Sequence, residues 1–157
     1  MACRNLSLFY WVALWAIALD RLSKYLMLRL LSGEFSSLRV FRYFSLTLVK
    51  NTGICFGMLS GFNVRIIVII ASFIIGLMIV LYLYRCPEKS MNTKIALGLI
   101  EGGIAGNLID RIATGAVIDF INFHFWPVFN LADVFIVSGI ALVFLQHMRR
   151  KNVSGVS

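Results

Sequence analysis

Glu101-Gly-Gly-Ile-Ala-Gly-Asn-Leu-Ile-Asp-Arg111 is the stretch of sequence that decides the fold of this chain. Within it, Gly102 and Gly106 form a small-residue face against which a neighbouring helix can pack closely. The stretch ends an apolar run with polar and charged side chains, and Asn130-Leu-Ala-Asp133 opens another apolar run nineteen residues later. Three of the four aspartates of the chain fall in this window. We therefore expect the chemistry of the protein where these two apolar runs meet.

The composition is that of an integral membrane protein. Of the 157 residues, 60% are hydrophobic and 14% are charged, and the mean hydropathy is +0.88. A soluble domain is about half apolar and about a quarter charged. The net charge is +8, but the basic residues are scattered and form no stripe interleaved with aromatics, so nucleic-acid binding is not indicated. The positive charge suits anionic lipid headgroups and the signals that set membrane topology.

Four apolar runs predict an all-α membrane protein of a single domain with four transmembrane helices. The first run resumes past Asp20 and has a weakly basic start, so we interpret it as a membrane helix and not as a cleaved signal peptide. Within the second run, Ile66–Tyr84 is uninterrupted and uncharged. The expected spans are 6–31, 64–84, 95–112 and 129–148, followed by a disordered tail at 152–157.

Two segments between the spans lie outside the expected helices. Phe44–Val49 alternates as a half-buried strand does, and Asn51-Thr-Gly53 is typical of a turn. We expect a small sheet or an amphipathic piece at the membrane surface within Ser32–Phe62, and we expect a peptide to dock along the Phe44–Phe56 strand and turn by edge pairing. We interpret the second segment, Thr114–Pro127, as a loop with interfacial aromatic residues. These aromatic residues are Phe120, Phe123, Phe125 and Trp126.

The basic residues at the ends of the spans predict the orientation. Four spans place both termini on one side of the membrane, and the positive-inside rule makes that side cytoplasmic. The residues concerned are Arg4, Arg85, Lys89, Lys94 and Arg149-Arg-Lys151. The three cysteines, Cys3, Cys55 and Cys86, are odd in number and widely spaced, so neither a structural disulfide nor a zinc motif is expected.

Three aspartates are predicted to lie at one depth in the membrane. Sixteen residues separate Arg4 from Asp20, Lys94 from Asp110, and Asp133 from Arg149. At 1.5 Å per residue, sixteen residues of helix rise about 24 Å from the basic boundary. The hydrocarbon core is about 30 Å thick, so the three carboxyl groups form one layer just below the outer face. Asp119, in the outer loop, can fold down into the same layer.

Two of these aspartates lack a basic neighbour in the sequence. Asp20 has Lys24 at i+4, and an ion pair between them is expected. Asp110 has Arg111 beside it, although an i,i+1 pair does not face directly. Asp119 and Asp133 have no basic residue within four positions. Two carboxyl groups held close together cannot both ionise, and such a pair can activate water as aspartic proteases do.

Other interpretations of these residues stay open at the level of sequence. Asn130 and Asp133 also fit a cap of the fourth helix, and Asn107 also fits a hydrogen bond between helices. The aspartates could form a proton relay in a small proton-coupled carrier or channel subunit, which would place carboxyl groups at several depths. The two histidines, His124 and His147, are isolated, so no metal and no organic cofactor are expected.

Five motifs across nearly the whole chain resemble the lipoprotein signal peptidases (signal peptidase II), which are membrane aspartyl proteases of bacteria. The motifs are Asp20-Arg-Leu-Ser-Lys24, Lys50-Asn-Thr-Gly-Ile-Cys-Phe56, Gly102-Gly-Ile-Ala-Gly-Asn-Leu-Ile-Asp-Arg111, Val117-Ile-Asp-Phe120 and Phe129-Asn-Leu-Ala-Asp133. Each motif is short, but five in the order of the family make a specific match. The chain departs from the family at Arg21, where Gln is usual, and at Glu101, where the residue is usually uncharged.

The resemblance implies a four-helix membrane fold with a small periplasmic β-cradle between the first two helices. It implies an endopeptidase of the bacterial inner membrane, with cytoplasmic termini and an active site near the periplasmic face. The implied reaction removes the signal peptide from diacylglyceryl-modified prolipoproteins, just before the lipidated cysteine. The implied partners are these substrates and membrane lipids, and we expect the chain to act as a monomer.

The resemblance also implies roles for individual residues. By motif position the catalytic pair is Asp119 and Asp133, in agreement with the lack of basic neighbours. Asp110 matches another important family position and is the main rival for a place in the pair. The residues implied to bind substrate or support the site are Asn51, Gly53, Asn107, Asp110, Arg111, Asn130, Asp20 and Lys24.

Overall fold

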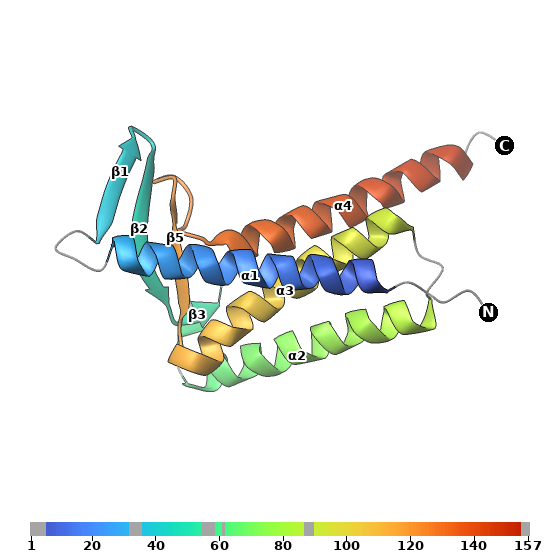
Figure 1. The fold of residues 1–157 in the computed structure, drawn as a ribbon, viewed down its shortest axis with the longest axis horizontal. Helices are drawn as coiled ribbons and strands as arrows, with labels where there is room; N and C mark the ends of the chain where they lie inside the picture. Colours follow the sequence, from blue (N-terminus) through green and yellow to red (C-terminus); the bar gives the residue numbers. More distant parts are fainter. Residues whose placement is uncertain (1–5, 32–35, 55–58, 61, 87–89, 155–157) are drawn as a thin grey trace.

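The computed structural model describes the chain except residues 1–5, 32–35, 55–58, 61, 87–89 and 155–157. Helices run alongside one another, and a small sheet lies at one end of them (Figure 1). α1 begins, and α4 ends, at the end away from the sheet. The helices are α1 (Ser7–Leu30), α2 (Phe62–Arg85), α3 (Met91–Thr114) and α4 (Leu131–Ser154). The strands are β1 (Ser37–Phe41), β2 (Phe44–Asn51), β3 (Gly53–Ile54), β4 (Leu59–Ser60) and β5 (Val117–Asn122).

The helices match the four expected spans in position, and two of them meet the requirements for crossing a membrane by length and composition. These two are Arg65–Arg85 within α2 and Leu131–Arg149 within α4. α1 and α3 also have 24 residues each, about 36 Å at 1.5 Å per residue, but they carry more ionisable side chains. Passage of α1 and α3 through the membrane therefore stays a prediction.

Glycines bring α1 and α4 close to α3, as the small-residue face predicts. A Cβ on Gly102 would lie 2.6 Å from the Cβ of Ala16, and a Cβ on Gly106 would lie 2.6 Å from Asp20 Oδ2, so both glycines face α1. On another side of α3, a Cβ on Gly103 would lie 2.5 Å from the backbone oxygen of Ala132 in α4. The close approach lets short polar side chains of the three helices reach one another.

Replacing Gly102 by Val should destabilise the protein by about 1–3 kcal/mol, because the added carbons have no room beside Ala16. Thermal unfolding in detergent measures the effect. Ala71→Val is the matched control, since it adds the same branch to an exposed position of α2 and should change the midpoint little. Equal midpoints for the two variants would contradict close packing at Gly102.

The three-stranded sheet contains the predicted strand, β2, between β1 and a strand in a segment where none was expected, β5. β2 confirms the strand expected at Phe44–Val49, and it pairs antiparallel with β1 on one side and β5 on the other. β1 pairs with residues 44–47 on one edge of β2 and β5 pairs with residues 45–51 on the other, so the expected docking of a peptide by edge pairing is wrong for residues 45–47, where both edges are occupied, and stays a prediction for the rest of 44–56. β5 occupies the segment interpreted as a loop, and Val49 pairs with Asp119.

Burial corrects the expectation for one aromatic residue. Phe120 was expected at the membrane interface, but it is only 5% exposed, because β5 is covered by its neighbours. Phe125 and Trp126 are 79% and 57% exposed, as interfacial residues would be.

Other predictions fall partly outside the described residues. Cys86 is a free, exposed cysteine, whereas Cys3 and Cys55 lie outside the described part of the chain. The expected tail begins within α4, which continues to Ser154, and its last residues, 155–157, are also outside it.

Candidate active site

Lys24 joins the predicted layer of aspartates. Its Nζ lies 2.8 Å from Asp20 Oδ2, which confirms the expected i,i+4 ion pair, and 2.7 Å from Asp110 Oδ2. It also donates a hydrogen bond of 3.0 Å to Asn107 Oδ1. All four side chains are buried. Asp20 on α1 and Asp110 on α3, each sixteen residues after a basic residue near the start of its helix, therefore lie at one level, as the sequence predicted.

The two aspartates paired with Lys24 also bind the backbone next to the other two aspartates. Asp110 Oδ2 accepts a hydrogen bond of 3.3 Å from the backbone N–H of Ile118, immediately before Asp119. Asp20 Oδ1 accepts one of 3.1 Å from the N–H of Ala132, immediately before Asp133. One buried lysine thus connects two carboxyl groups that fix β5 and the start of α4.

Asp133 caps α4 and faces α3 at the same time. The backbone N–H of Asp133 donates to Asn130 Oδ1 at 3.0 Å, and the N–H of Asn130 donates to Asp133 Oδ2 at 3.2 Å. This reciprocal pair is a capping box, so the capping interpretation is confirmed. The second carboxyl oxygen of Asp133 accepts a hydrogen bond of 2.9 Å from Asn107 Nδ2, which confirms the bond expected between helices. The cap orients the Asp133 carboxyl group toward α3.

Asp119 is held by two asparagine amides. Asn51 Nδ2 at the end of β2 donates to Asp119 Oδ2 at 3.0 Å, and Asn130 Nδ2 donates to Asp119 Oδ1 at 2.6 Å. Burial raises the pKa of Asp119 from its ordinary 3.8 to about 6; the negative charge of Asp133 adds to the rise, and the hydrogen bonds from Asn51 and Asn130 oppose it. Asp119 therefore changes its protonation state near neutral pH.

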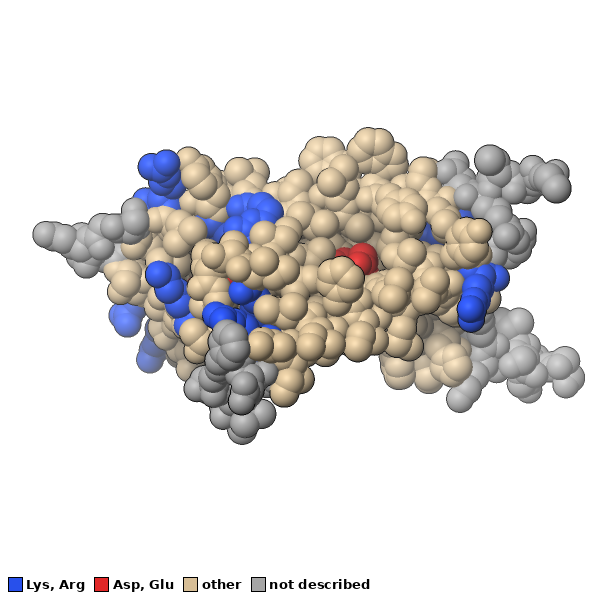
Figure 2. All heavy atoms as spheres, turned by 90° about the horizontal axis from the view of Figure 1, so that it is seen from below, with Lys and Arg blue, Asp and Glu red and all other residues tan. Residues whose placement is uncertain are grey.

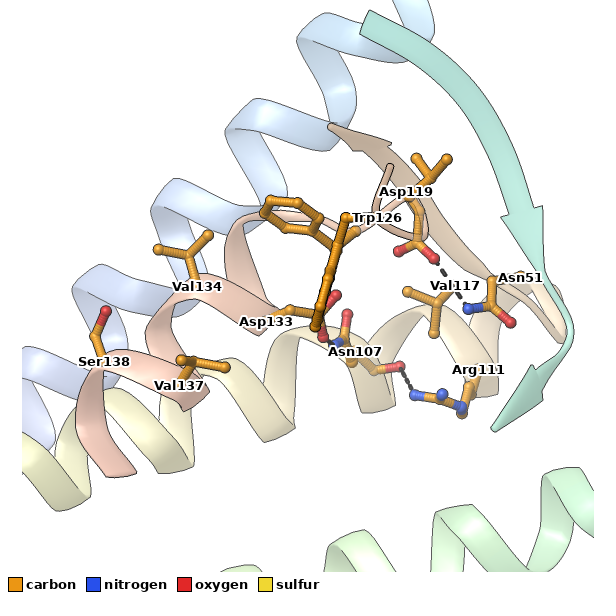
Figure 3. A pocket seen from close by; sticks show the side chains of 12 residues that line it. Asn51, Asn107, Arg111, Val117, Asp119, Trp126, Asp133, Val134, Val137 and Ser138 are labelled. Atoms are coloured by element: carbon orange, nitrogen blue, oxygen red, sulfur yellow. Dashed lines mark hydrogen bonds between the residues drawn. The ribbon is translucent and has the colours of Figure 1, made fainter. Parts of the chain in front are cut away.

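Asp119 and Asp133 line the same cavity, which has a volume of about 490 Å³. Figure 3 shows the two carboxyl groups approaching it from β5 and α4, with Asn51 and Arg111 nearby. Arg111 donates a hydrogen bond of 3.4 Å to the backbone oxygen of Asn107, so its cationic group is held beside the cavity. The apolar part of the wall consists of Val117, Trp126, Val128, Phe129, Val134 and Val137. The arrangement can hold an apolar ligand against two carboxyl groups and a cation.

A family model described as Signal peptidase (SPase) II matches residues 12–149. The chain belongs to the signal peptidase II family. A lipoprotein signal peptidase of Halothermothrix orenii is 41% identical over 144 residues, covering 92% of this chain and 97% of the relative. One of Moorella thermoacetica is 36% identical over 138 residues, covering 88% and 91%. A solved bacterial membrane enzyme is 26% identical with a TM-score of 0.78, covering 91% of this chain and 88% of that one.

Membership of the signal peptidase II family makes this chain a peptidase, and the carrier alternative is not supported. The predicted site residues other than Gly53 are joined by the contacts described above or line the cavity. Gly53 lies two residues beyond Asn51, in β3, where it pairs with Ser60. Asp110, the rival for the pair, is bound by Lys24 and does not line the cavity.

Some residues of this signal peptidase II site were not predicted. Arg21 forms an ion pair with Asp110, and its departure from the family pattern was the one signal that pointed to it. Val134, Val137 and Ser138 line the cavity one and two turns into α4, where an apolar helix gives no local signal. Within the described part of the chain, no three of His, Cys, Asp and Glu lie together in a way that could hold a metal ion.

Proposed function

We propose that this signal peptidase II removes the signal peptide from diacylglyceryl-modified prolipoproteins, cutting just before the lipidated cysteine. The names of its relatives support the substrate class. The observation that carries the assignment of the residues is the link between the two carboxyl groups. Asn130 donates to Asp119 and also to Asn107, which in turn donates to Asp133, and both carboxyl groups line one cavity.

In the proposed mechanism, Asp119 and Asp133 act as an acid–base pair on one water molecule. The ionised carboxyl group removes a proton from the water as its oxygen attacks the scissile carbonyl carbon. The protonated partner donates its proton to the carbonyl oxygen, which gives a tetrahedral diol. The intermediate then collapses and the C–N bond breaks: the leaving nitrogen takes a proton from the carboxyl group that acted as base, and one hydroxyl group of the diol returns its proton to the other carboxylate as the new C=O bond forms. The pair ends with one proton, as it began.

The rest of the cavity is proposed to hold the peptide. Asn51 and Arg111 stand where they can bind peptide oxygens, and the cation of Arg111 can stabilise negative charge on the tetrahedral intermediate. The apolar wall formed by Val134 and Val137 suits the uncharged residues that precede the cleavage site. Gly53 supports the turn after Asn51 in this proposal.

The proposed placement has four membrane spans, cytoplasmic termini and the cavity near the periplasmic face of the inner membrane. The start of α1 and the end of α4 at one end, with the sheet at the other, support it (Figure 1). At this height the cavity would meet a cysteine anchored to the bilayer by its diacylglyceryl group. The proposed partners are the substrate and membrane lipids, and the proposed active form is a monomer.

Gel-shift cleavage of a purified prolipoprotein tests the substrate. We expect the diacylglyceryl-modified form to be cut and the same precursor without the lipid to be spared, because the lipid is what holds the cleavage site at the height of the cavity. Mass spectrometry of the product should find the lipidated cysteine at its new N-terminus. Equal cleavage of both precursors, or of neither, would contradict the proposal.

Replacing Asn51 by Ala should move the transition of the pH–rate profile that arises from the ionisation of Asp119 to higher pH. Loss of the amide donor removes a hydrogen bond to the charged form, so the pKa of Asp119 should rise further above about 6. A hydrogen bond to a charged group contributes about 1.5–3 kcal/mol, which is at least about one pH unit. The measurement is kcat/KM between about pH 4.5 and 8.5.

Asn122→Ala is the matched control for this experiment, because the Asn122 amide binds Thr47 in the same sheet and does not touch the pair. Its profile should keep the wild-type position. A profile of Asn51→Ala that stays in place or moves to lower pH would contradict the role of Asn51. The stability that protonated Asp119 contributes is full below about pH 3.8 and is lost as pH rises through about 6.

A further inference from the structure

Glu101 lies near the middle of α3 and takes no part in the aspartate network. Its carboxyl group lies against α2, where Oε1 is 2.7 Å from the position that a Cβ of Gly76 would occupy. Only a glycine leaves that space. The other oxygen, Oε2, is buried and has no hydrogen-bond partner among the described residues. The proposed cleavage does not use this carboxyl group.

The Glu101 carboxyl group lines a groove between α2 and α3. The groove has a volume of about 200 Å³. Figure 2 shows acidic atoms at the surface partway along a face whose Lys and Arg residues gather toward its two ends. The other residues of the groove are Ser72, Phe73, Gly76, Leu77, Val80, Ile104, Ala105 and Leu108. The groove is thus an apolar site with one carboxyl group.

The chemistry of the groove indicates its ligand. A carboxylate in apolar surroundings is costly unless a cation pairs with it, and the described ion pairs of the chain do not include Glu101. A lone carboxyl group there keeps its proton, and a cation that enters the groove from outside the described residues would pair with it in place of that proton. Small-molecule sites recognise an apolar body by their walls and one polar group by a placed charge. The exposed ring of Phe73 on the rim adds a face that attracts cations.

We propose that the groove between α2 and α3 is a binding site for a lipid-soluble organic amine, with its ammonium group paired to Glu101. The apolar body of the amine lies along Leu77 and Leu108. The occupant is a small molecule, because α2 and α3 contact each other at Gly76 and leave no room for a further helix between them. The site is separate from the cavity of Asp119 and Asp133 and does not depend on the proposed function.

Labelling with dicyclohexylcarbodiimide tests the site in the full-length protein. The carboxyl O–H adds across one C=N bond of the reagent, and the acyl group then moves from oxygen to nitrogen, so the product carries the whole mass of the reagent. Mass spectrometry of peptides locates it. We expect label on Glu101, and we expect N,N-dimethyldecylamine, a tertiary amine that cannot form an amide with the activated carboxyl group, to slow labelling about tenfold at about ten times its Kd, because only the unoccupied site reacts.

Four controls make the outcome decisive. Decanol, which has the same chain and no ammonium group, should not protect Glu101. Dimethyldecylamine should raise the unfolding temperature of the wild type but not of Glu101→Gln, and Gly76→Ala should weaken protection because its Cβ displaces the carboxyl group. Prolipoprotein cleavage by Glu101→Gln without amine should match the wild type. Absence of protection by dimethyldecylamine, or equal protection by decanol, would mean that Glu101 merely carries a proton, and the proposal would be wrong.

Discussion

Asp133→Asn and Asp119→Asn should each abolish prolipoprotein cleavage, with a loss of about 10³-fold or more, while the protein stays folded. An amide has nearly the shape of a carboxyl group but cannot take a proton from water or give one to the carbonyl oxygen. The measurement is the single-turnover rate of gel-shift cleavage, with thermal unfolding as the test of folding. Asp133→Asn should also weaken the cap of α4 by about 1 kcal/mol.

The cleavage rate of Asp110→Asn tests whether Asp110, and not Asp119 or Asp133, is a catalytic aspartate. Asp110 is bound by Lys24, Arg21 and the N–H of Ile118, and it does not line the cavity. We therefore expect Asp110→Asn to be less stable but to keep measurable cleavage. If Asp119→Asn cuts at the wild-type rate and Asp110→Asn is inactive, the peptidase activity is confirmed but the assignment of Asp119 and Asp133 as the catalytic pair is wrong.

The layer of aspartates could be predicted because it follows from helix geometry. Equal spacing from a basic boundary places Asp20 and Asp110 at one height, and the contacts through Lys24 bear this out. The shortage of basic neighbours singled out Asp119 and Asp133 by the same kind of local reasoning. A pattern within one helix is enough for such predictions, since the rise per residue is fixed.

The partners of these residues could not be predicted in the same way. β5 was interpreted as a loop because its short apolar run gains strand structure only by pairing with β2, some seventy residues earlier in the chain. The burial of Phe120 follows from that pairing. The hydrogen bonds from the backbone N–H groups of Ile118 and Ala132 also join separate elements of the fold. A backbone donor cannot be predicted from a pattern of side chains in the sequence. What the sequence could not predict is therefore the support that holds Asp119 and Asp133, whereas their role as a catalytic pair stays a prediction.

Lys24→Met should destabilise the protein by about 3–5 kcal/mol, because it leaves the buried carboxyl groups of Asp20 and Asp110 without their shared cation. Thermal or denaturant unfolding in detergent measures this loss. Arg21→Met is the control, since Arg21 also pairs with Asp110 but is 36% exposed, and its loss should cost less than about 1 kcal/mol.

A charge-balanced variant tests whether the loss comes from unpaired charge or from lost packing. Asp20→Asn combined with Lys24→Met removes one carboxylate with the lysine and should recover part of the stability, whereas lost packing would not be recovered. Cleavage should stay low in the combined variant, because the bonds from Asp20 and Asp110 to the N–H groups of Ala132 and Ile118 depend on the position that Lys24 gives them. Stability restored together with full cleavage would show that Lys24 only neutralises charge and does not position the pair.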